Sequence, residues 1–244
     1  MKKFYEIKNF INNKSADLYI YGEIVTDDKN WWTNEKDENL IGLQTFKKEM
    51  DNLGDILDLN IYLNTPGGEV FVASTMCSIL QRLKDSGTKI HTFVDGLCAS
   101  SGTFLLMMGD DINMYENSMI MIHKPMAYCY GNTNDLQKCV DMLNTIENST
   151  MIPIYMKKAL KTEEEIKEKI NEESWMGATE AKEYFDINLI EEENKAVACV
   201  DSTIFNNYKN VPEKLKKLLK KDVNTTTNAV KIDYSGFEKR LESL

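Results

Sequence analysis

Two turns and one histidine are the parts of this sequence whose residue types and spacing could carry out acyl-transfer chemistry. Gly67 and Gly68 lie in the first turn, Ser100 and Ser101 lie in the second, and His123 follows a short apolar run. A serine nucleophile needs an imidazole that accepts its proton and two backbone N–H groups that face the developing oxyanion. Glycine lets the backbone approach a substrate closely, and amides at the start of a helix favour negative charge. These residues together predict a serine-dependent site.

The choice of a base is narrow, because the sequence holds only 2 histidines. His91 falls inside the segment 89–93, whose alternating residues predict a strand. His123 closes a strand-like run, and strand ends are where open α/β sheets usually place their functional groups. His123 is therefore the candidate base, although a single histidine after an apolar run is more often structural.

The elements that must position these groups alternate along the chain. Strands are expected at 18–24, 59–64 and 89–94, helices at 40–53, 72–84 and 103–108, and two short apolar segments between 113 and 122. This alternation predicts an α/β fold with parallel strands, in which both turns lie at the carboxyl ends of strands.

Two further helices and a polar tail are expected after the candidate base. A long helix is predicted over 135–155, interrupted only at Pro153, and a charged helix over 162–171 has Thr162 as its N-cap. Beyond about residue 200 the sequence becomes polar and rich in lysine. We therefore expect one domain over residues 1–200 and a C-terminal extension over residues 201–244.

Composition and charge exclude several classes of function. The formal net charge of -10 disfavours binding to nucleic acid or to an anionic membrane, and no apolar run is long enough to span a bilayer. The 5 cysteines are scattered, without a CxxC pair or a metal-like grouping, so we expect reduced thiols and no metal site. We also expect no cofactor and a cytoplasmic location.

Three motifs, in this order and at this spacing, resemble the signature of the Clp protease proteolytic subunit (ClpP) family. They occupy residues 64–68, 96–102 and 121–125, and the resemblance extends over roughly residues 15–195, including 175–184. It implies a crotonase-like fold, a spiral of ββα units with a protruding helix through which subunits oligomerise. It also implies a homo-oligomer, a ring or stacked rings, that encloses the sites and acts on peptides and proteins.

The resemblance implies a role for each matched residue. Ser100 becomes the nucleophile and His123 the general base, while the backbone amides of Gly68 and Ser101 form the oxyanion hole. Gly67 belongs to the turn that binds substrate. In this arrangement the base takes the serine proton during attack and returns it to the leaving amine.

The acid of the implied triad is where this sequence departs from the family. The family's usual aspartate position falls on Glu173, whose extra methylene changes the reach of the carboxylate, and Glu172 is one alignment step away. Both glutamates could also be solvated charges at a helix end. A Ser-Lys dyad that uses Lys124 is a further alternative, suggested by more distant relatives of the fold.

Two departures make the sequence similar to the ClpP-like head-maturation proteases of tailed phages and prophages. The chain enters the strand at 18–24 without the family's long N-terminal gating segment, and it continues past residue 200. Such a protease would trim capsid and scaffold proteins without needing an unfolding ATPase.

The alternatives are a cellular ClpP subunit that works with an AAA+ unfoldase, a crotonase-fold acyl-coenzyme A enzyme, and a non-catalytic assembly protein. An α/β-hydrolase is disfavoured, because no Gly-x-Ser-x-Gly elbow surrounds Ser100.

Overall fold

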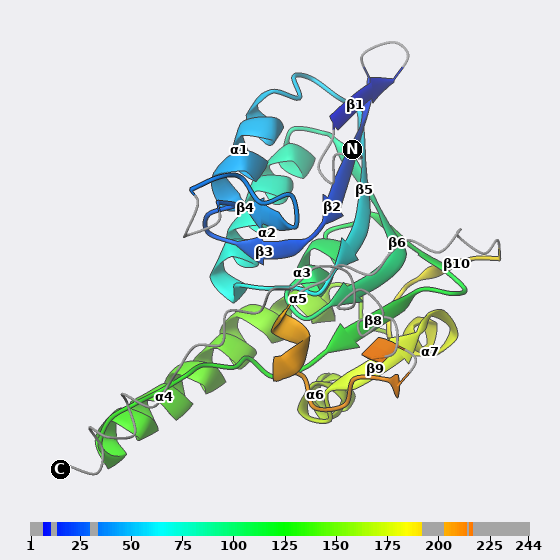
Figure 1. The fold of residues 1–244 in the computed structure, drawn as a ribbon. Coiled ribbons are helices and arrows are strands. Elements are labelled where there is room, and N and C mark those ends of the chain that lie inside the picture. The colour runs from blue at the N-terminus through cyan, green and yellow to red at the C-terminus, as the bar shows by residue number, and fades with distance from the viewer. Residues whose placement is uncertain (1–6, 11–13, 30–33, 192–202, 214, 217–244) are drawn as a thin grey trace. The chain divides into compact units, whose positions relative to one another are not determined.

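The structure is a computed structural model that describes residues 7–10, 14–29, 34–191, 203–213 and 215–216 (Figure 1). The chain divides into two compact units, Met1–Pro212 and Glu213–Leu244. The domain boundary expected at residue 200 therefore lies inside the first unit. Most of the second unit lies outside the described residues.

A mostly parallel sheet forms the centre of the first unit. Its eight strands, among the described residues, are β1 (Ile7–Phe10), β2 (Ser15–Tyr21), β5 (Asp58–Thr65), β6 (Lys89–Ala99), β7 (Asp111–Tyr115), β8 (Met119–Ile122), β9 (Ser174–Gly177) and β10 (Asn188–Ile190). The main order is β1-β2-β5-β6-β7-β10, with only β1 antiparallel to its neighbour. The first half of β6 pairs with β7 and its second half with β8, which β9 joins in antiparallel pairing. This architecture confirms the predicted α/β fold with parallel strands.

Helices and a small second sheet surround these strands. The helices are α1 (Leu43–Asp51), α2 (Val70–Asp85), α3 (Gly102–Leu106), α4 (Thr133–Ile146), α5 (Ile152–Met156), α6 (Glu163–Asn171) and α7 (Ala178–Tyr184). A π-helical turn, η1 (Glu147–Met151), joins α4 to α5, and a 3₁₀ helix, η2 (Thr203–Asn207), lies near the end of the unit. Strands β3 (Glu23–Val25) and β4 (Leu40–Gly42) pair in parallel.

Side chains alternate between the two faces of the sheet, so that one face packs into the core and the other carries a row of aromatic rings. In β5, Leu59, Ile61 and Leu63 are fully buried, while the residues between them face the other side of the sheet. On that other side Tyr62 stacks against Tyr19 and Phe93, with ring centroids 4.9 Å apart in both pairs. The sheet is therefore fixed by packing on both faces.

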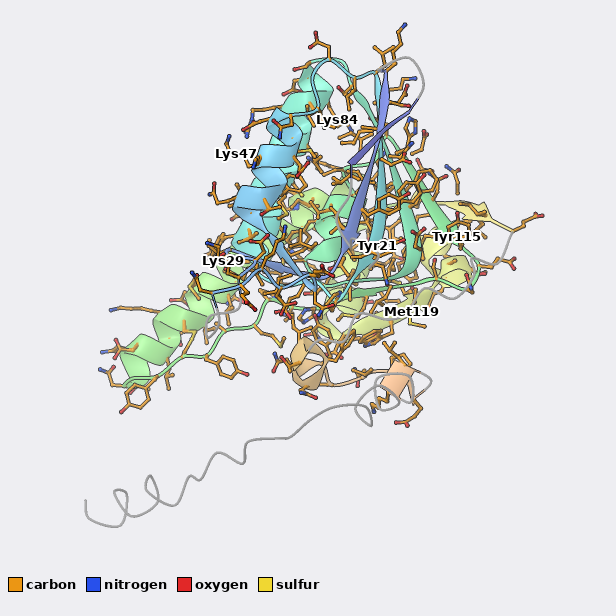
Figure 2. All side chains as sticks on the ribbon, turned by 45° about the horizontal axis from the view of Figure 1, so that its top comes forward. Tyr21, Lys29, Lys47, Lys84, Tyr115 and Met119 are labelled. Atoms are coloured by element: carbon orange, nitrogen blue, oxygen red, sulfur yellow. A yellow bond between two sulfur atoms is a disulfide. The ribbon has the colours of Figure 1, made fainter. Side chains whose placement is uncertain are left out.

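Helix ends follow the local signals in most places. α6 begins at Thr162, whose side chain accepts from the Glu165 amide in a capping box, as the sequence predicts. The helix expected over 40–53 begins later, at Leu43, because residues 40–42 extend to pair with β3. Lys47 on α1 and Lys84 on α2 belong to the charged outer surface of these helices (Figure 2).

The stretch predicted as one long helix over 135–155 is helical but divided. α4 starts in a capping box at Asn132 and projects away from the sheet (Figure 1). The π-helical turn ends just before Ile152, so that Pro153 lies near the start of α5. Leu136, Val140 and Met142 remain exposed along α4.

Two cysteines depart from the expectation of reduced thiols. The segment after β8 runs beside α4, so that Cys129 and Cys139, with Cα atoms 6.4 Å apart, form a disulfide. Cys77 and Cys98 are free and buried, whereas Cys199 lies outside the described residues. The prediction of reduced thiols is thus wrong for the Cys129–Cys139 pair.

Within the part of the chain that the structure describes, no helix is long and apolar enough to cross a membrane.

Candidate active site

Ser100 lies in the sharp connection between β6 and α3. Its φ of 52° is in the left-handed region, which is costly for a residue with a side chain and is often kept at functional sites. The Ser100 amide donates to the carbonyl of Met121 on β8 at 2.8 Å, which ties the connection to the neighbouring strand. The backbone thus holds the serine in a strained but defined position.

His123 follows the last residue of β8 and faces the serine. Its Nε2 lies 2.7 Å from Ser100 Oγ, within the range that proton transfer needs. The side chain is only 8% exposed, and burial lowers its pKa to about 4, a shift that the charge of Glu173 opposes only in part. The imidazole is therefore neutral near pH 7 and able to accept a proton.

The Gly67–Gly68 turn approaches the serine so closely that side chains are excluded. A Cβ on Gly67, whose φ is +94°, would lie 2.7 Å from the Ser100 Cβ. A Cβ on Gly68 would lie 2.0 Å from the carbonyl oxygen of Ile24. The hydroxyl of Ser101 donates to the Gly68 carbonyl at 3.1 Å and so links the two turns. The requirement for both glycines is steric.

The backbone amides of Gly68 and Ser101 are the two that the sequence analysis expects to form an oxyanion hole. Within the described residues, no acceptor is found for the amide of Gly68 or of Ser101. Ser101 is the N-cap of α3, so its amide belongs to the first turn of a helix, where N–H groups have no partner in the helix itself. Such donors can stabilise negative charge on a substrate oxygen.

Of the two candidate acids, Glu173 is the one that lies beside the base. It is 9% exposed and has a φ of 53°, whereas Glu172 is exposed at the end of α6. The charge of Glu173 acts on His123, yet among the described residues its hydrogen bonds come from elsewhere. Its carboxylate accepts from the amides of Lys209 at 2.9 Å and Asn210 at 2.6 Å.

The two other candidate bases are engaged elsewhere. Lys124 Nζ lies 3.1 Å from the buried carboxylate of Glu147 in the π-helical turn. His91, in the first half of β6, has Nδ1 2.8 Å from Asp111 Oδ2. Neither geometry supports a Ser-Lys dyad or a second histidine base.

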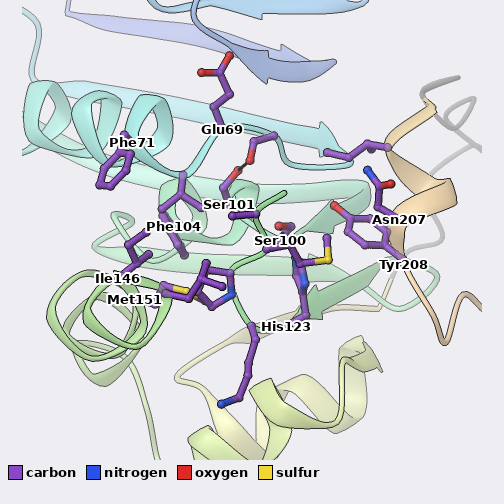
Figure 3. A pocket seen from close by; sticks show the side chains of 18 of the residues that line it. Glu69, Phe71, Ser100, Ser101, Phe104, His123, Ile146, Met151, Asn207 and Tyr208 are labelled. Atoms are coloured by element: carbon purple, nitrogen blue, oxygen red, sulfur yellow. Dashed lines mark hydrogen bonds between the residues drawn. The ribbon is translucent and has the colours of Figure 1, made fainter. Parts of the chain in front are cut away.

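A cavity of about 750 Å³ opens beside the serine and the histidine (Figure 3). One side is apolar and is lined by Phe71, Phe104, Ile146 and Met151, while Asn207 and Tyr208 lie on the opposite side, next to Ser100 (Figure 3). The sequence analysis missed the contribution of residues 203–208. The apolar spacing of Ile204, Phe205, Tyr208 and Val211 was the available signal.

The sequence matches the family model for Clp protease over residues 40–194. The chain belongs to the Clp protease family. The match includes both turns, the base and Glu173, and the α/β fold with its mostly parallel sheet is the fold of this family.

Similar bacterial members of the family are named as proteolytic subunits. The chain is 31% identical over 144 residues to ATP-dependent Clp protease proteolytic subunit 1 of Prochlorococcus marinus (strain MIT 9312), covering 54% of this chain and 67% of that protein. It is 29% identical over 140 residues to the ATP-dependent Clp protease proteolytic subunit of Porphyromonas gingivalis (strain ATCC BAA-308 / W83), covering 57% of this chain and 61% of that protein. The chain thus spans about two thirds or less of the length of these relatives.

Proposed function

We propose that this chain is a Clp-type serine endopeptidase subunit with Ser100 as nucleophile and His123 as general base. The observation that carries the proposal is the 2.7 Å separation of Ser100 Oγ and His123 Nε2 at the mouth of an apolar cavity. Membership of the Clp protease family supports the same chemistry.

The geometry suggests how peptide hydrolysis would proceed. A peptide side chain enters the cavity, and its scissile carbonyl lies between Ser100 Oγ and the amides of Gly68 and Ser101. His123 accepts the hydroxyl proton as the C–O bond forms, and the two amides hold the negative oxygen. His123 then protonates the departing amine. In the second half of the reaction a water molecule attacks the acyl-enzyme, His123 accepts its proton, and the proton returns to Ser100 as the peptide acid leaves. Gly67 gives the substrate backbone room to approach.

Glu173 assists this base through its charge. A carboxylate near the imidazole stabilises the imidazolium that forms during attack. Because its hydrogen bonds come from Lys209 and Asn210, its orientation depends on the segment that carries those residues. In this proposal the glutamate serves as the acid of the triad through its charge, because within the described residues its carboxylate is hydrogen-bonded to Trp175, Lys209 and Asn210.

The working unit in this proposal is a homo-oligomer. Leu136 and Val140, one turn apart on α4, together with Tyr128 and Tyr130 in the segment before this helix, are large exposed apolar side chains. Exposed apolar surfaces of this kind mark contacts between subunits. Enclosing the sites in a ring or stacked rings would restrict substrates to unfolded proteins and peptides.

The relatives favour a cellular subunit that works with an ATPase over a phage head-maturation protease. Their names contain "ATP-dependent". Similarity to these relatives is the reason for proposing an ATPase partner of the AAA+ class for this chain. Cleavage of capsid and scaffold proteins stays a prediction of the sequence, as does the separate role of residues 201–244.

Labelling with a fluorophosphonate probe, followed by intact-mass analysis, tests the proposal directly. The wild-type oligomer is expected to gain one label per chain, and Ser100→Ala and His123→Ala are expected to lose it. Ser78→Ala, at an exposed serine on α2 away from the cavity, is the matched control and is expected to remain labelled. Absence of label from a correctly assembled wild-type protein would contradict the proposal and favour the acyl-coenzyme A or assembly alternatives.

A further inference from the structure

The segment Thr203–Pro212 contacts the candidate triad although it lies beyond the matched family region. Phe205, Tyr208 and Val211 are each 6% exposed, and the segment belongs to the same compact unit as the sheet. Figure 3 shows Tyr208 and Asn207 beside the pocket, facing Ser100. Burial of three large apolar side chains fixes the segment there.

Tyr208 joins three parts of the site. Its hydroxyl donates to the carbonyl of Pro66 at 2.6 Å. Pro66 is the residue before Gly67 in the Gly67–Gly68 turn. Its ring meets the His123 ring edge-on, with centroids 5.1 Å apart, and meets Trp175 at 5.9 Å. One side chain thus contacts both the turn and the base.

The Tyr208 phenol stays protonated, so it can always donate its hydrogen bond. Burial raises the pKa of its phenol, while an interaction with the Ser100 hydroxyl opposes that rise. The hydroxyl therefore keeps its proton at any working pH and continues to bind the Pro66 carbonyl.

The same segment fixes the acid. The amides of Lys209 and Asn210 donate to the two oxygens of Glu173, and the Asn210 side chain donates to the Glu172 carbonyl at 2.8 Å. Hydrogen bonds to a carboxylate are among the stronger ones in proteins, so they hold Glu173 at a fixed distance from His123. Glu173 also has a positive φ, which the surrounding contacts must maintain.

A segment that blocks the site would close the cavity or break the Ser–His contact, and this one does neither. The cavity retains about 750 Å³ with Ile204, Asn207 and Tyr208 as part of its wall. The Ser100 Oγ to His123 Nε2 distance remains 2.7 Å while the segment is packed. The segment therefore lines the cavity and stabilises the residues around it without blocking access to Ser100.

We infer that Thr203–Pro212 completes the active site, and that Tyr208 is a positioning residue that holds the His123 ring and the Pro66–Gly68 turn in their reactive arrangement. The inference rests on the proposed peptidase function. It assigns part of the extension beyond residue 200 to catalysis.

Tyr208→Phe tests the inference with the least disturbance, because it keeps the ring against His123 and removes only the contacts of the hydroxyl, with the Pro66 carbonyl and with the Ser100 side chain. Tyr184→Phe removes a phenol hydroxyl from α7, outside the cavity, and is the matched control. Steady-state cleavage of a fluorogenic peptide and the rate of fluorophosphonate labelling are measured for both variants and the wild type.

Tyr208→Phe is expected to lower kcat and the labelling rate about tenfold, equivalent to about 1.4 kcal/mol, with KM changed less than about twofold. Tyr184→Phe is expected to match the wild type. Equal rates in Tyr208→Phe and the wild type, with Ser100 still labelled, would overturn the inference and leave the peptidase function intact. If the wild type is not labelled, the function fails and the inference fails with it.

A shortened chain that ends at residue 202 distinguishes support from inhibition. The inference predicts a loss of labelling of about tenfold or more in a chain whose circular dichroism and oligomeric state match the wild type. A gain in labelling or in peptide cleavage would show that the segment restrains the enzyme, which would also overturn the inference.

Discussion

The burial of His123 makes the pH dependence of nucleophilic attack a sharp test of the site. The perturbation is a change of pH from 7.5 to 5.5, which stays above the sequence pI of about 4.9. A neutral imidazole is required as base, so activity is present above the pKa of His123 and is lost as the pH falls through it. The groups that face the ring are Ser100, Tyr208 and Glu173, while the adjacent Lys124 pairs with Glu147.

The size of the effect follows from the pKa of about 4. A histidine with an ordinary pKa of about 6.5 would be about 9% neutral at pH 5.5, so the rate would fall about tenfold from its value at pH 7.5. With a pKa of about 4, the imidazole is still about 97% neutral at pH 5.5. The rate should then change by less than about 10%.

The assay is the second-order rate of fluorophosphonate labelling at Ser100, measured at both pH values with the oligomeric state and circular dichroism recorded at each. Labelling avoids the titration of a peptide substrate, and the Ser100→Ala variant gives the background. A tenfold fall at pH 5.5 in protein that remains folded and assembled would refute the reasoning. It would mean that the His123 ring is solvated, or that Glu173 binds it directly.

Three further predictions concern the turn, the disulfide and a helix cap. Gly67→Ala is expected to lower the labelling rate about 100-fold, because its Cβ would lie against the side chain of Ser100. Gly87→Ala, with a similar φ of +99° and no neighbour within 4 Å, should leave the rate unchanged. Equal rates in both variants would contradict the steric explanation. Cys139→Ser is expected to lower the free energy of unfolding by about 2–3 kcal/mol in urea without reductant, because it opens the loop to Cys129 of sequence separation 10. Reductant should lower the wild-type value equally, and an unchanged value would mean that the disulfide does not form. Thr162→Ala should lower the free energy of unfolding by about 1 kcal/mol, with Thr162→Ser close to the wild type; a larger loss in the serine variant would refute the capping role.

Local patterns were enough to predict the elements and the pair of reacting groups. Alternation predicted β5, and helical spacing predicted α2, because both patterns record which side chains face the core. Ser100 and His123 follow the adjacent parallel strands β6 and β8, so their proximity comes from the sheet. The rule that parallel strands place functional groups at their carboxyl ends therefore predicts that the two motifs lie together.

Contacts between distant, irregular segments could not be predicted in the same way. The hydrogen bond from Tyr208 to Pro66 joins residues separated by 142 positions and depends on no repeating pattern. The strand at 40–42 was missed because its partner β3 overrides the helical spacing of those residues. The disulfide was missed because spacing alone does not show that the segment after β8 runs back along α4.

The shared strand β6 has a consequence for how this site could change over time or be redesigned. Residues 97–99 pair with 119–121 on β8, and Ser100 adds a main-chain bond to Met121 at 2.8 Å. The separation of Ser100 and His123 is therefore set by a backbone ladder, and the side chains of the cavity wall do not determine it. Residues such as Phe71 and Met151 could be exchanged to accept other peptide side chains while the reacting pair keeps its geometry. If the chain acts as proposed, its substrate preference and its reactivity are thus separable properties.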